Sequence, residues 1–310
     1  MVHGFAANAR MWNSPTQKRS LPRYLCEAGY PVYVIDLRNR RDAGLPVWDM
    51  DDYVLYDIPC ALNYIAGREE TPLLHWIGHS MGGMLAYMFQ TLGRAHRLVS
   101  VTTLGSPGLR VQPAGARHIS ASKSLLQSLL RPAPDQGRLD LIPPSLIGAV
   151  LALNFMSRNP LGGSVSRSSF AAMLSGNYMG NVSKTEARQL TSIVEGRGLH
   201  SRRFRFNYAL NCHRITAPLL VFAGDKDRIA PRKLVEQGYT DAWAKSKKFI
   251  PLGRRFGQKA SYGHMELIMG HTCEQDIWPK LLEWLEESRA DRMPITDGCE
   301  PDHFPLSGIA

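Results

Sequence analysis

Short apolar runs alternate with stretches of helical periodicity along most of the chain. Residues 31–37 are rich in β-branched side chains, as buried strands are, whereas residues 51–65 carry apolar side chains at helical spacing. Such alternation is typical of a mostly parallel sheet with helices on both faces. The expected strands are 31–37, 73–77, 98–104, 218–223 and 248–252, and the expected helices of this framework are 51–65, 81–92 and 274–288.

The alternation is interrupted between residues 110 and 212. This interval holds helical pieces, such as 124–130 and 145–156, separated by loops rich in Pro, Gly and Ser. We therefore expect an insertion between two strands of one sheet, and a loose, polar tail at the end of the chain. The predicted division is 1–109 and 213–290 for the two parts of the core, 110–212 for a helical cap insertion, and 291–310 for the tail.

The composition is that of a globular protein with a substantial core. Of the 310 residues, 44% are apolar and 21% are charged, which suits one large α/β domain. The longest uncharged stretch, 141–157, contains two prolines and is expected to be a buried or pocket-lining helix rather than a membrane span. Five scattered cysteines without a C-x-x-C pair argue against a disulfide framework and favour a reducing compartment. The first residues show no secretory pattern, so the expected location is the cytoplasm.

Positive charge is concentrated in the predicted insertion. The whole chain has a formal net charge of +10, and residues 110–212 hold 13 Lys/Arg against four acids, which is +9. This excess indicates an attraction to anionic substrates or to an acidic membrane surface, or simply a well-solvated face. No basic and aromatic nucleic-acid module is recognisable, so nucleic acid is not an expected partner.

The strongest chemical signal is the sequence Gly78-His79-Ser80-Met81-Gly82, which lies at an expected strand-to-helix junction. Such a sharp turn can hold a serine in a strained conformation if the residues two positions before and after it are small, and both are glycine here. The N-terminus of the following helix directs free backbone N–H groups to the same place. Ser80 is therefore predicted to be a nucleophile, against the simpler interpretation of a tight structural turn.

A serine hydroxyl becomes a strong nucleophile only beside a base that takes its proton and an acid that orients the base. Two acids, Asp225 and Asp227, follow the expected strand 218–223, and His264 follows the last strand. The order serine, acid, histidine is the order of nucleophile-elbow enzymes. The residues alone leave Asp225 and Asp227 open as the acid, and His271 stays open as an alternative base.

These motifs make the chain resemble the α/β-hydrolase superfamily, and within it the lipase and esterase branches. The resemblance to the superfamily covers nearly all of the chain outside the insertion. The stretches that look like the lipase and esterase branches are 48–65, 263–270 and 278–285. It implies the α/β-hydrolase fold, in which a mostly parallel sheet carries helices on both faces and a helical cap covers the active site. It also implies serine-hydrolase chemistry that uses no metal or cofactor.

The resemblance selects among the open residues. In the superfamily the acid stands in a G-x-x-D-x-I/V-x-P pattern, which residues 224–231 match with Asp227 as the acid. Asp225 is then expected to shape the turn, because aspartate readily bonds to nearby backbone. The base falls on His264, which stands in a glycine-histidine motif, whereas His79 is expected to pack beside the nucleophile.

The superfamily completes its oxyanion hole with a histidine-glycine motif after an earlier strand, and His3-Gly4-Phe5 matches this motif. The resemblance assigns the two backbone donors to Phe5 and Met81, while Gly4 allows a close approach and His3 orders the loop. In the superfamily the motif closes a strand near the centre of the sheet. We therefore expect that the N-terminal strands are missing here, and that Met1 is not the native start or the chain is a fragment, because a lost central strand leaves its neighbours unpaired.

Together these features predict a serine hydrolase that cleaves carboxylic esters with apolar acyl chains. Ser80 is expected to attack the carbonyl, His264 to accept its proton, and Asp227 to orient the imidazole. Apolar residues of the insertion are expected to wall the acyl pocket, or to pack the cap onto the core. The alternatives are an acyltransferase or another triad hydrolase of the same fold, and a non-catalytic binding protein that keeps the pocket. The expected partner is a small-molecule or lipid ester.

Overall fold

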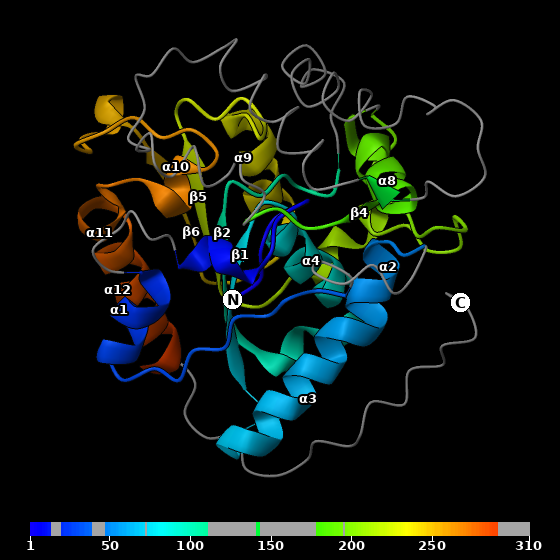
Figure 1. Cartoon of the computed structure of the whole chain (residues 1–310), viewed down its shortest axis with the longest axis horizontal. Coiled ribbons are helices and arrows are strands. Elements are labelled where there is room, and N and C mark those ends of the chain that lie inside the picture. The colour runs from blue at the N-terminus through cyan, green and yellow to red at the C-terminus, as the bar shows by residue number, and fades with distance from the viewer. Residues whose placement is uncertain are drawn as a thin grey trace.

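A four-stranded parallel sheet is the centre of the computed structural model of the chain (Figure 1). Every neighbouring pair of its strands runs parallel, as the alternation of strands and helices predicts. In spatial order the strands are β1 (Leu74–His79), β2 (Leu98–Leu104), β5 (Leu219–Gly224) and β6 (Lys247–Leu252). The structure describes residues 1–13, 20–38, 47–71, 73–110, 141–142, 178–194 and 196–290.

Successive side chains of the strands enter two separate hydrophobic cores, one on each face of the sheet. In β5, Leu219 and Val221 join one cluster, whereas Leu220 and Phe222 join the other. All four side chains are fully buried. A strand that is buried on both faces has no polar alternation, and it therefore appears as a continuous apolar run in the sequence.

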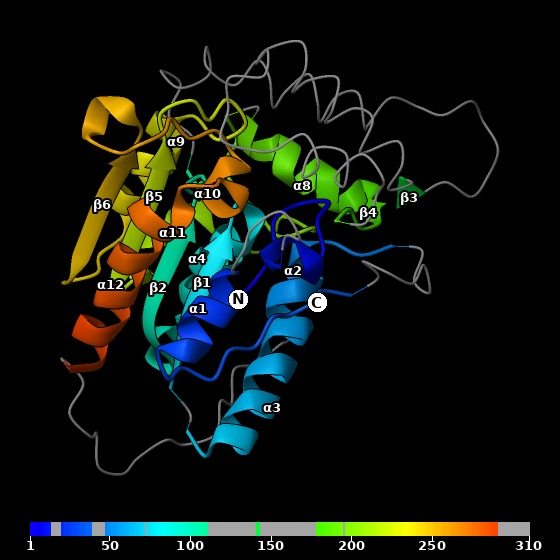
Figure 2. The same cartoon turned by 60° about the vertical axis from the view of Figure 1, so that its left-hand side comes forward.

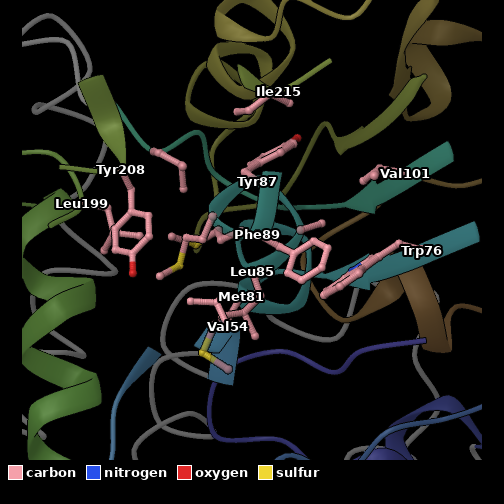
Figure 3. Close-up of a cluster of buried hydrophobic side chains, with 14 of the residues drawn as sticks. Val54, Trp76, Met81, Leu85, Tyr87, Phe89, Val101, Leu199, Tyr208 and Ile215 are labelled. Atoms are coloured by element: carbon pink, nitrogen blue, oxygen red, sulfur yellow. The ribbon is translucent and has the colours of Figure 1, made fainter. Parts of the chain in front are cut away.

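Helices cover both faces of the sheet. One face carries α1 (Leu21–Glu27) and α12 (Trp278–Ala290), which lie side by side in Figures 1 and 2. The other face carries α4 (Met81–Phe89) and α9 (Arg232–Asp241). Every residue of α4 is buried, and Figure 3 shows its side chains among those of β1, β2 and the chain after residue 198. The helix that follows Ser80 is thus fixed on several sides.

The helix expected at 51–65 runs from Met50 to Glu69, with one π-helical turn inside it. Asp49 caps its start by accepting hydrogen bonds from the next backbone amides. The π-helical turn precedes Pro59, whose ring and missing N–H disturb the regular ladder. The three parts are α2 (Met50–Asp52), η2 (Tyr53–Asp57) and α3 (Ile58–Glu69).

The prediction of one continuous helix over 274–288 is wrong. The chain forms a short helix, α11 (Cys273–Asp276), and then α12, which begins at Trp278. Pro279 is the second residue of α12, where its missing N–H costs no hydrogen bond. Inside a continuous helix the same proline would remove a hydrogen bond and clash with the preceding turn. The proline therefore separates the two helices.

The prediction of a buried strand at 31–37 is also wrong. The segment is extended but mostly half-buried or exposed, and within the described residues its bridge to the sheet is a single parallel one, between Ile35 and Val2. Val2 also bridges to Gly78 of β1, and the Ile35 amide donates to the Met1 oxygen. Because these backbone contacts involve only Met1 and Val2, the described residues do not give the segment the row of hydrogen bonds that a strand needs.

Most of the predicted insertion lies outside the described residues, as do the helices expected at 124–130 and 145–156 and the tail 291–310. Residues 141–142 form a strand, so the helix expected from residue 141 is wrong at its start. Ile142 precedes a proline, a position that disfavours helical backbone. The described elements here are β3 (Leu141–Ile142), its antiparallel partner β4 (Val182–Ser183), α8 (Lys184–Val194) and η6 (Ala209–Arg214).

Short helices complete the described part of the chain. Figure 2 shows α8 at the same end of the molecule as α10, the short helix that follows His264. None of the helices formed by the described residues is long and apolar enough to cross a membrane. The remaining elements are η1 (Ala9–Trp12), η3 (Gln90–Arg94), η4 (Ala95–Arg97), η7 (Arg254–Phe256) and α10 (Glu266–Met269).

Candidate active site

Ser80 lies at the junction between β1 and α4 with a strained backbone. Its φ of 52° and ψ of −118° place a non-glycine residue at positive φ, which costs about 1–3 kcal/mol. The Ser80 amide donates to the Leu104 oxygen at the end of β2, and the Ser80 oxygen accepts from the Gly83 and Met84 amides of α4. These hydrogen bonds hold the serine in the turn, while the residue stays partly exposed.

Packing requires both glycines that flank the serine. A Cβ atom on Gly78 would lie 2.5 Å from the backbone of Gly82, and one on Gly82 would lie 2.2 Å from the Val2 oxygen. Neither glycine has a positive φ. The requirement therefore comes from the close approach of β1, α4 and the start of the chain, and not from backbone conformation.

We expect Gly82→Ala to lower the free energy of unfolding by about 3 kcal/mol, because the added methyl group overlaps backbone that cannot move aside. Gly67→Ala is the matched control. Gly67 lies in α3, is exposed and has open space at its Cβ position, so alanine should raise the free energy of unfolding by up to about 1 kcal/mol. Urea unfolding measures both changes, and parental stability of Gly82→Ala would contradict the packing described above.

The structure brings Asp227 and His264 into direct contact. Asp227 Oδ2 lies 2.8 Å from His264 Nδ1, and both side chains are buried. The other carboxylate oxygen, Oδ1, accepts hydrogen bonds from the amides of Ile229 and Ala230, which fix the orientation of the carboxylate. With Nδ1 held by a carboxylate, Nε2 is the nitrogen that can act as a base.

Asp225 has different partners from Asp227. It accepts hydrogen bonds from the Tyr262 amide and the Ser261 hydroxyl, two residues of the loop that leads to His264. Asp225 therefore joins the two loops, and Asp227 contacts the histidine. His271, the alternative base, is exposed in the turn before α11.

Gly105 connects the two halves of the site. It follows Leu104, whose oxygen bonds to the Ser80 amide, and its own φ is 61°. A Cβ atom on Gly105 would lie 3.1 Å from Asp227 Oδ2 and 3.3 Å from His264 Nδ1. The end of β2 thus contacts the serine turn and also the Asp–His pair. In the sequence this glycine is visible only as the end of a strand. A glycine at such a position is compatible with close approach of another segment to the backbone, but the sequence does not identify that segment.

His79, expected only to pack beside the nucleophile, supports the loop of His264. Its Nε2 lies 3.1 Å from the His264 backbone oxygen, and the two ring centroids are 4.6 Å apart. Burial lowers the pKa of His79 well below its ordinary value, and the neighbouring His264 lowers it further. A neutral ring that donates from Nε2 fits these contacts. Its contribution depends on tertiary contact and leaves no signal in the sequence.

The loop of His3, Gly4 and Phe5 lies against the serine. His3 is fully buried, and its Nδ1 lies 2.9 Å from the Gly4 oxygen. A Cβ atom on Gly4 would lie 3.1 Å from Ser80 Cβ, so the backbone of this loop approaches the nucleophile closely. Phe5 follows directly and is half-buried. Met81 is the first residue of α4, whose first N–H groups have no partner inside the helix.

A buried carboxyl group, Glu266, lies beside the Asp–His pair. The residue is 1% exposed, and its carboxylate has no side-chain hydrogen-bond partner among the described residues. A Cβ atom on Gly263 would lie 2.5 Å from Glu266 Oε2, so the glycine before His264 leaves room for this side chain. Burial raises the pKa of Glu266 and the charge of Asp227 raises it further, which outweighs the opposite effect of the nearby backbone amides of Gly263 and of Glu266 itself.

We expect Glu266→Gln to stabilise the protein at neutral pH. An acid whose pKa is raised on folding opposes folding while it is ionised, and this cost disappears as the pH falls to its ordinary pKa. Glutamine carries no charge, so its advantage should be largest at about pH 8 and vanish by about pH 4. Urea unfolding at both pH values tests this, and an advantage of equal size at both would contradict it.

Residues 1–266 match the alpha/beta hydrolase family. This range includes the Ser80 turn, Asp227 and His264, and covers most of the chain. The chain belongs to the alpha/beta hydrolase family. The fold that the family implies is the one described above, with a parallel sheet and helices on both faces.

Two relatives of this chain are named as lipases. Gastric triacylglycerol lipase of Homo sapiens is 29% identical over 99 residues, which are 28% of this chain and 25% of that lipase. The match therefore spans about a quarter of the length of that relative. A probable lipase of Schizosaccharomyces pombe is 21% identical over 321 residues, which cover 92% of this chain and 69% of that protein.

Solved structures of lipases and esterases share the fold of this chain. The monoacylglycerol lipase of Paleococcus ferrophilus superimposes with a TM-score of 0.55 at 18% identity, covering 93% of both chains. A thermophilic esterase from Thermogutta terrifontis gives a TM-score of 0.54 at 17% identity, covering 93% of this chain and 88% of that chain. The likeness confirms the predicted α/β-hydrolase fold.

Proposed function

We propose that the chain is a serine hydrolase of carboxylic esters, with Ser80 as nucleophile, His264 as base and Asp227 as the acid that orients the base. The strained Ser80 turn carries the proposal, because a non-glycine residue held at positive φ between a strand and a buried helix is a typical way to expose a nucleophile. The hydrogen bond between Asp227 and His264 supports it. The position of Gly105 also supports it. This glycine lies against the Asp–His pair, and the residue before it, Leu104, accepts the hydrogen bond from the Ser80 amide.

The proposed reaction has two steps, acylation and deacylation of Ser80, and His264 is the base in both. Ser80 Oγ bonds to the ester carbonyl carbon while His264 Nε2 takes the hydroxyl proton, and the amides of Phe5 and Met81 stabilise the oxyanion. The bond to the alkoxy oxygen then breaks, and the alcohol leaves with the proton from His264. Water loses a proton to His264 and attacks the acyl carbon. The bond between that carbon and Ser80 Oγ then breaks, and His264 returns the proton to Oγ, which releases the carboxylic acid and restores both residues. Asp227 stabilises the imidazolium in both steps.

An ester with an apolar acyl chain is the favoured substrate within this proposal. By their names, the gastric relative acts on triacylglycerol and the structural relative on monoacylglycerol. Both substrates are glycerol esters of apolar acids. An apolar side chain also lies beside the Asp–His pair. Leu267 Cδ1 would be 2.9 Å from a Cβ atom on Gly105, the glycine that lies against that pair.

A series of p-nitrophenyl esters, from acetate to palmitate, tests the proposal. We expect hydrolysis of the series, with kcat/KM rising from acetate to chains of intermediate length. Added glycerol separates hydrolysis from acyl transfer, because a transferase would form monoacylglycerol in place of the free acid. A cooperatively folded protein that cleaves none of these esters would contradict the proposal and favour a binding role.

A further inference from the structure

Residues 201–206 form a tight, exposed turn with the sequence Ser-Arg-Arg-Phe-Arg-Phe. The Ser201 amide donates to the Phe206 oxygen, and the Phe204 amide donates to the Ser201 oxygen. The four residues at the tip are all exposed. Phe204 is 69% exposed and has a φ of 56°. An exposed aromatic ring and a left-handed bulky residue both cost free energy in water.

Positive charge surrounds this turn. Residues 184–205 hold six Lys/Arg against two acids, a net charge of +4, and one of the acids, Glu186, is fully buried. Arg202 forms ion pairs with Asp49 and Asp52, and its amide donates to Asp51. These acids anchor the turn to the start of α2 and offset the charge of Arg202, so the positive charge that can face a ligand comes from other arginines. The other exposed arginines around it are Arg188, Arg197, Arg203 and Arg205.

A cavity of about 430 Å³ lies beside the turn, against α8. It shares Ser201, Arg202 and Phe204 with the turn, and its other basic residues are Arg188, Arg197 and His200. Arginine guanidinium groups are donors that suit phosphate oxygens. The hydroxyl groups that line the cavity contribute little, because those of Thr185, Thr191 and Ser192 already donate to backbone oxygens.

We propose that this docking surface, the 201–206 turn together with the cavity beside it, binds an anionic phospholipid bilayer. Phe204 enters the interface between the headgroups, where burial of its ring is favourable, and the surrounding arginines contact lipid phosphates. A soluble anion would use the cavity but would gain nothing from an exposed ring at the tip. The combination of ring and charge therefore favours a lipid surface.

The docking surface connects directly to the loop beside Ser80. Residues 178–180 precede β4 and α8 and pair with that loop: the Gly180 amide donates to the Ala6 oxygen, and the Asn8 amide to the Tyr178 oxygen. Figure 2 shows α8 at the same end of the molecule as α10, next to His264. Docking would thus bring the site toward the bilayer. Binding itself requires none of the chemistry proposed for Ser80.

Vesicle binding by the full chain carrying Ser80→Ala, which prevents turnover, tests the inference. We expect at least tenfold tighter binding to equimolar phosphatidylglycerol and phosphatidylcholine vesicles than to phosphatidylcholine alone, weakening as salt rises. Adding Phe204→Gly should lower the affinity about tenfold. It should also leave the unfolding temperature unchanged or higher, since glycine relieves the positive φ. Arg203→Gln should lower the affinity about fivefold.

Trp243→Ala is the matched control. Trp243 is 71% exposed but precedes β6, at the opposite end of the strands from the loops that carry the site, so its loss should leave vesicle binding unchanged. Equal affinity for both vesicles, or an affinity that Phe204→Gly does not change, would overturn the docking surface. Ester hydrolysis is measured separately in the parent chain. If it is absent while binding depends on Phe204, the inference stands and the proposed function fails.

Discussion

Ser80→Ala is expected to lower kcat for p-nitrophenyl ester hydrolysis by at least about 10⁴-fold. The variant lacks the oxygen that forms the acyl-enzyme, and the oxyanion donors alone leave only a small residual rate. KM should change by no more than about threefold, because the hydroxyl group contributes mainly to the transition state. Steady-state kinetics with the best ester of the series provides the measurement.

Two stability measurements show whether the loss is chemical. Alanine keeps the positive φ of residue 80, so Ser80→Ala should unfold at the parental temperature. Ser80→Gly relieves that φ and should unfold at a higher temperature while being equally inactive. A Ser80→Ala variant that retained more than about a tenth of the parental kcat would refute the nucleophile assignment.

Asp227→Asn is expected to lower kcat by about 10⁴-fold. Asparagine can keep its oxygen on the amides of Ile229 and Ala230, which turns the amide nitrogen toward His264. The imidazole must then accept at Nδ1 and carry its proton on Nε2, so it cannot act as the base. Kinetics across the pH range is the measurement, because the loss should persist at every pH where the parent is active.

Asp225→Asn is the matched control in the same loop. Asp225 bonds to Tyr262 and Ser261 and does not carry the contact with His264. Its replacement should lower the free energy of unfolding by about 1 kcal/mol and leave kcat within about threefold of the parent. Loss of activity in Asp225→Asn but not in Asp227→Asn would reverse the two assignments.

The sheet could be predicted because its inner strands are buried on both faces. β2 and β5 lie between other strands. β5 appears as an uninterrupted apolar run, and the polar residues of β2 are three small hydroxyl residues, Ser100, Thr102 and Thr103, all fully buried. Two elements are predicted wrongly, because the residue pattern of each suits one kind of element while the backbone hydrogen bonds that the element needs are missing from the described part of the chain. Residues 31–37 have strand composition but only a short neighbour, and residues 274–288 keep helical periodicity across Pro279. The spacing of apolar side chains does not show whether a strand has a neighbour to bond with, or whether a proline removes an N–H from a helix.

The site could be predicted only in part. The Ser80 turn is recognisable because two small residues flank the serine within five positions, and Gly78 is required by a contact with Gly82 inside that turn. The contact that requires Gly82, with the Val2 oxygen, is not visible in the sequence. Choosing between Asp225 and Asp227 required a family resemblance, since their tertiary partners alone distinguish them. The contributions of three other residues arise from contacts between distant segments, which no local pattern encodes: Gly105, His79 and Glu266.

Labelling with a fluorophosphonate probe, followed by peptide mapping by mass spectrometry, tests the central claim most directly. Such probes phosphonylate only an activated serine, so the measurement does not depend on the choice of ester. We expect one adduct, on the peptide that contains Ser80, formed far more slowly in Asp227→Asn and absent from Ser80→Ala. An adduct on another residue, or labelling that persists in Ser80→Ala, would contradict the assignment of Ser80 as the nucleophile.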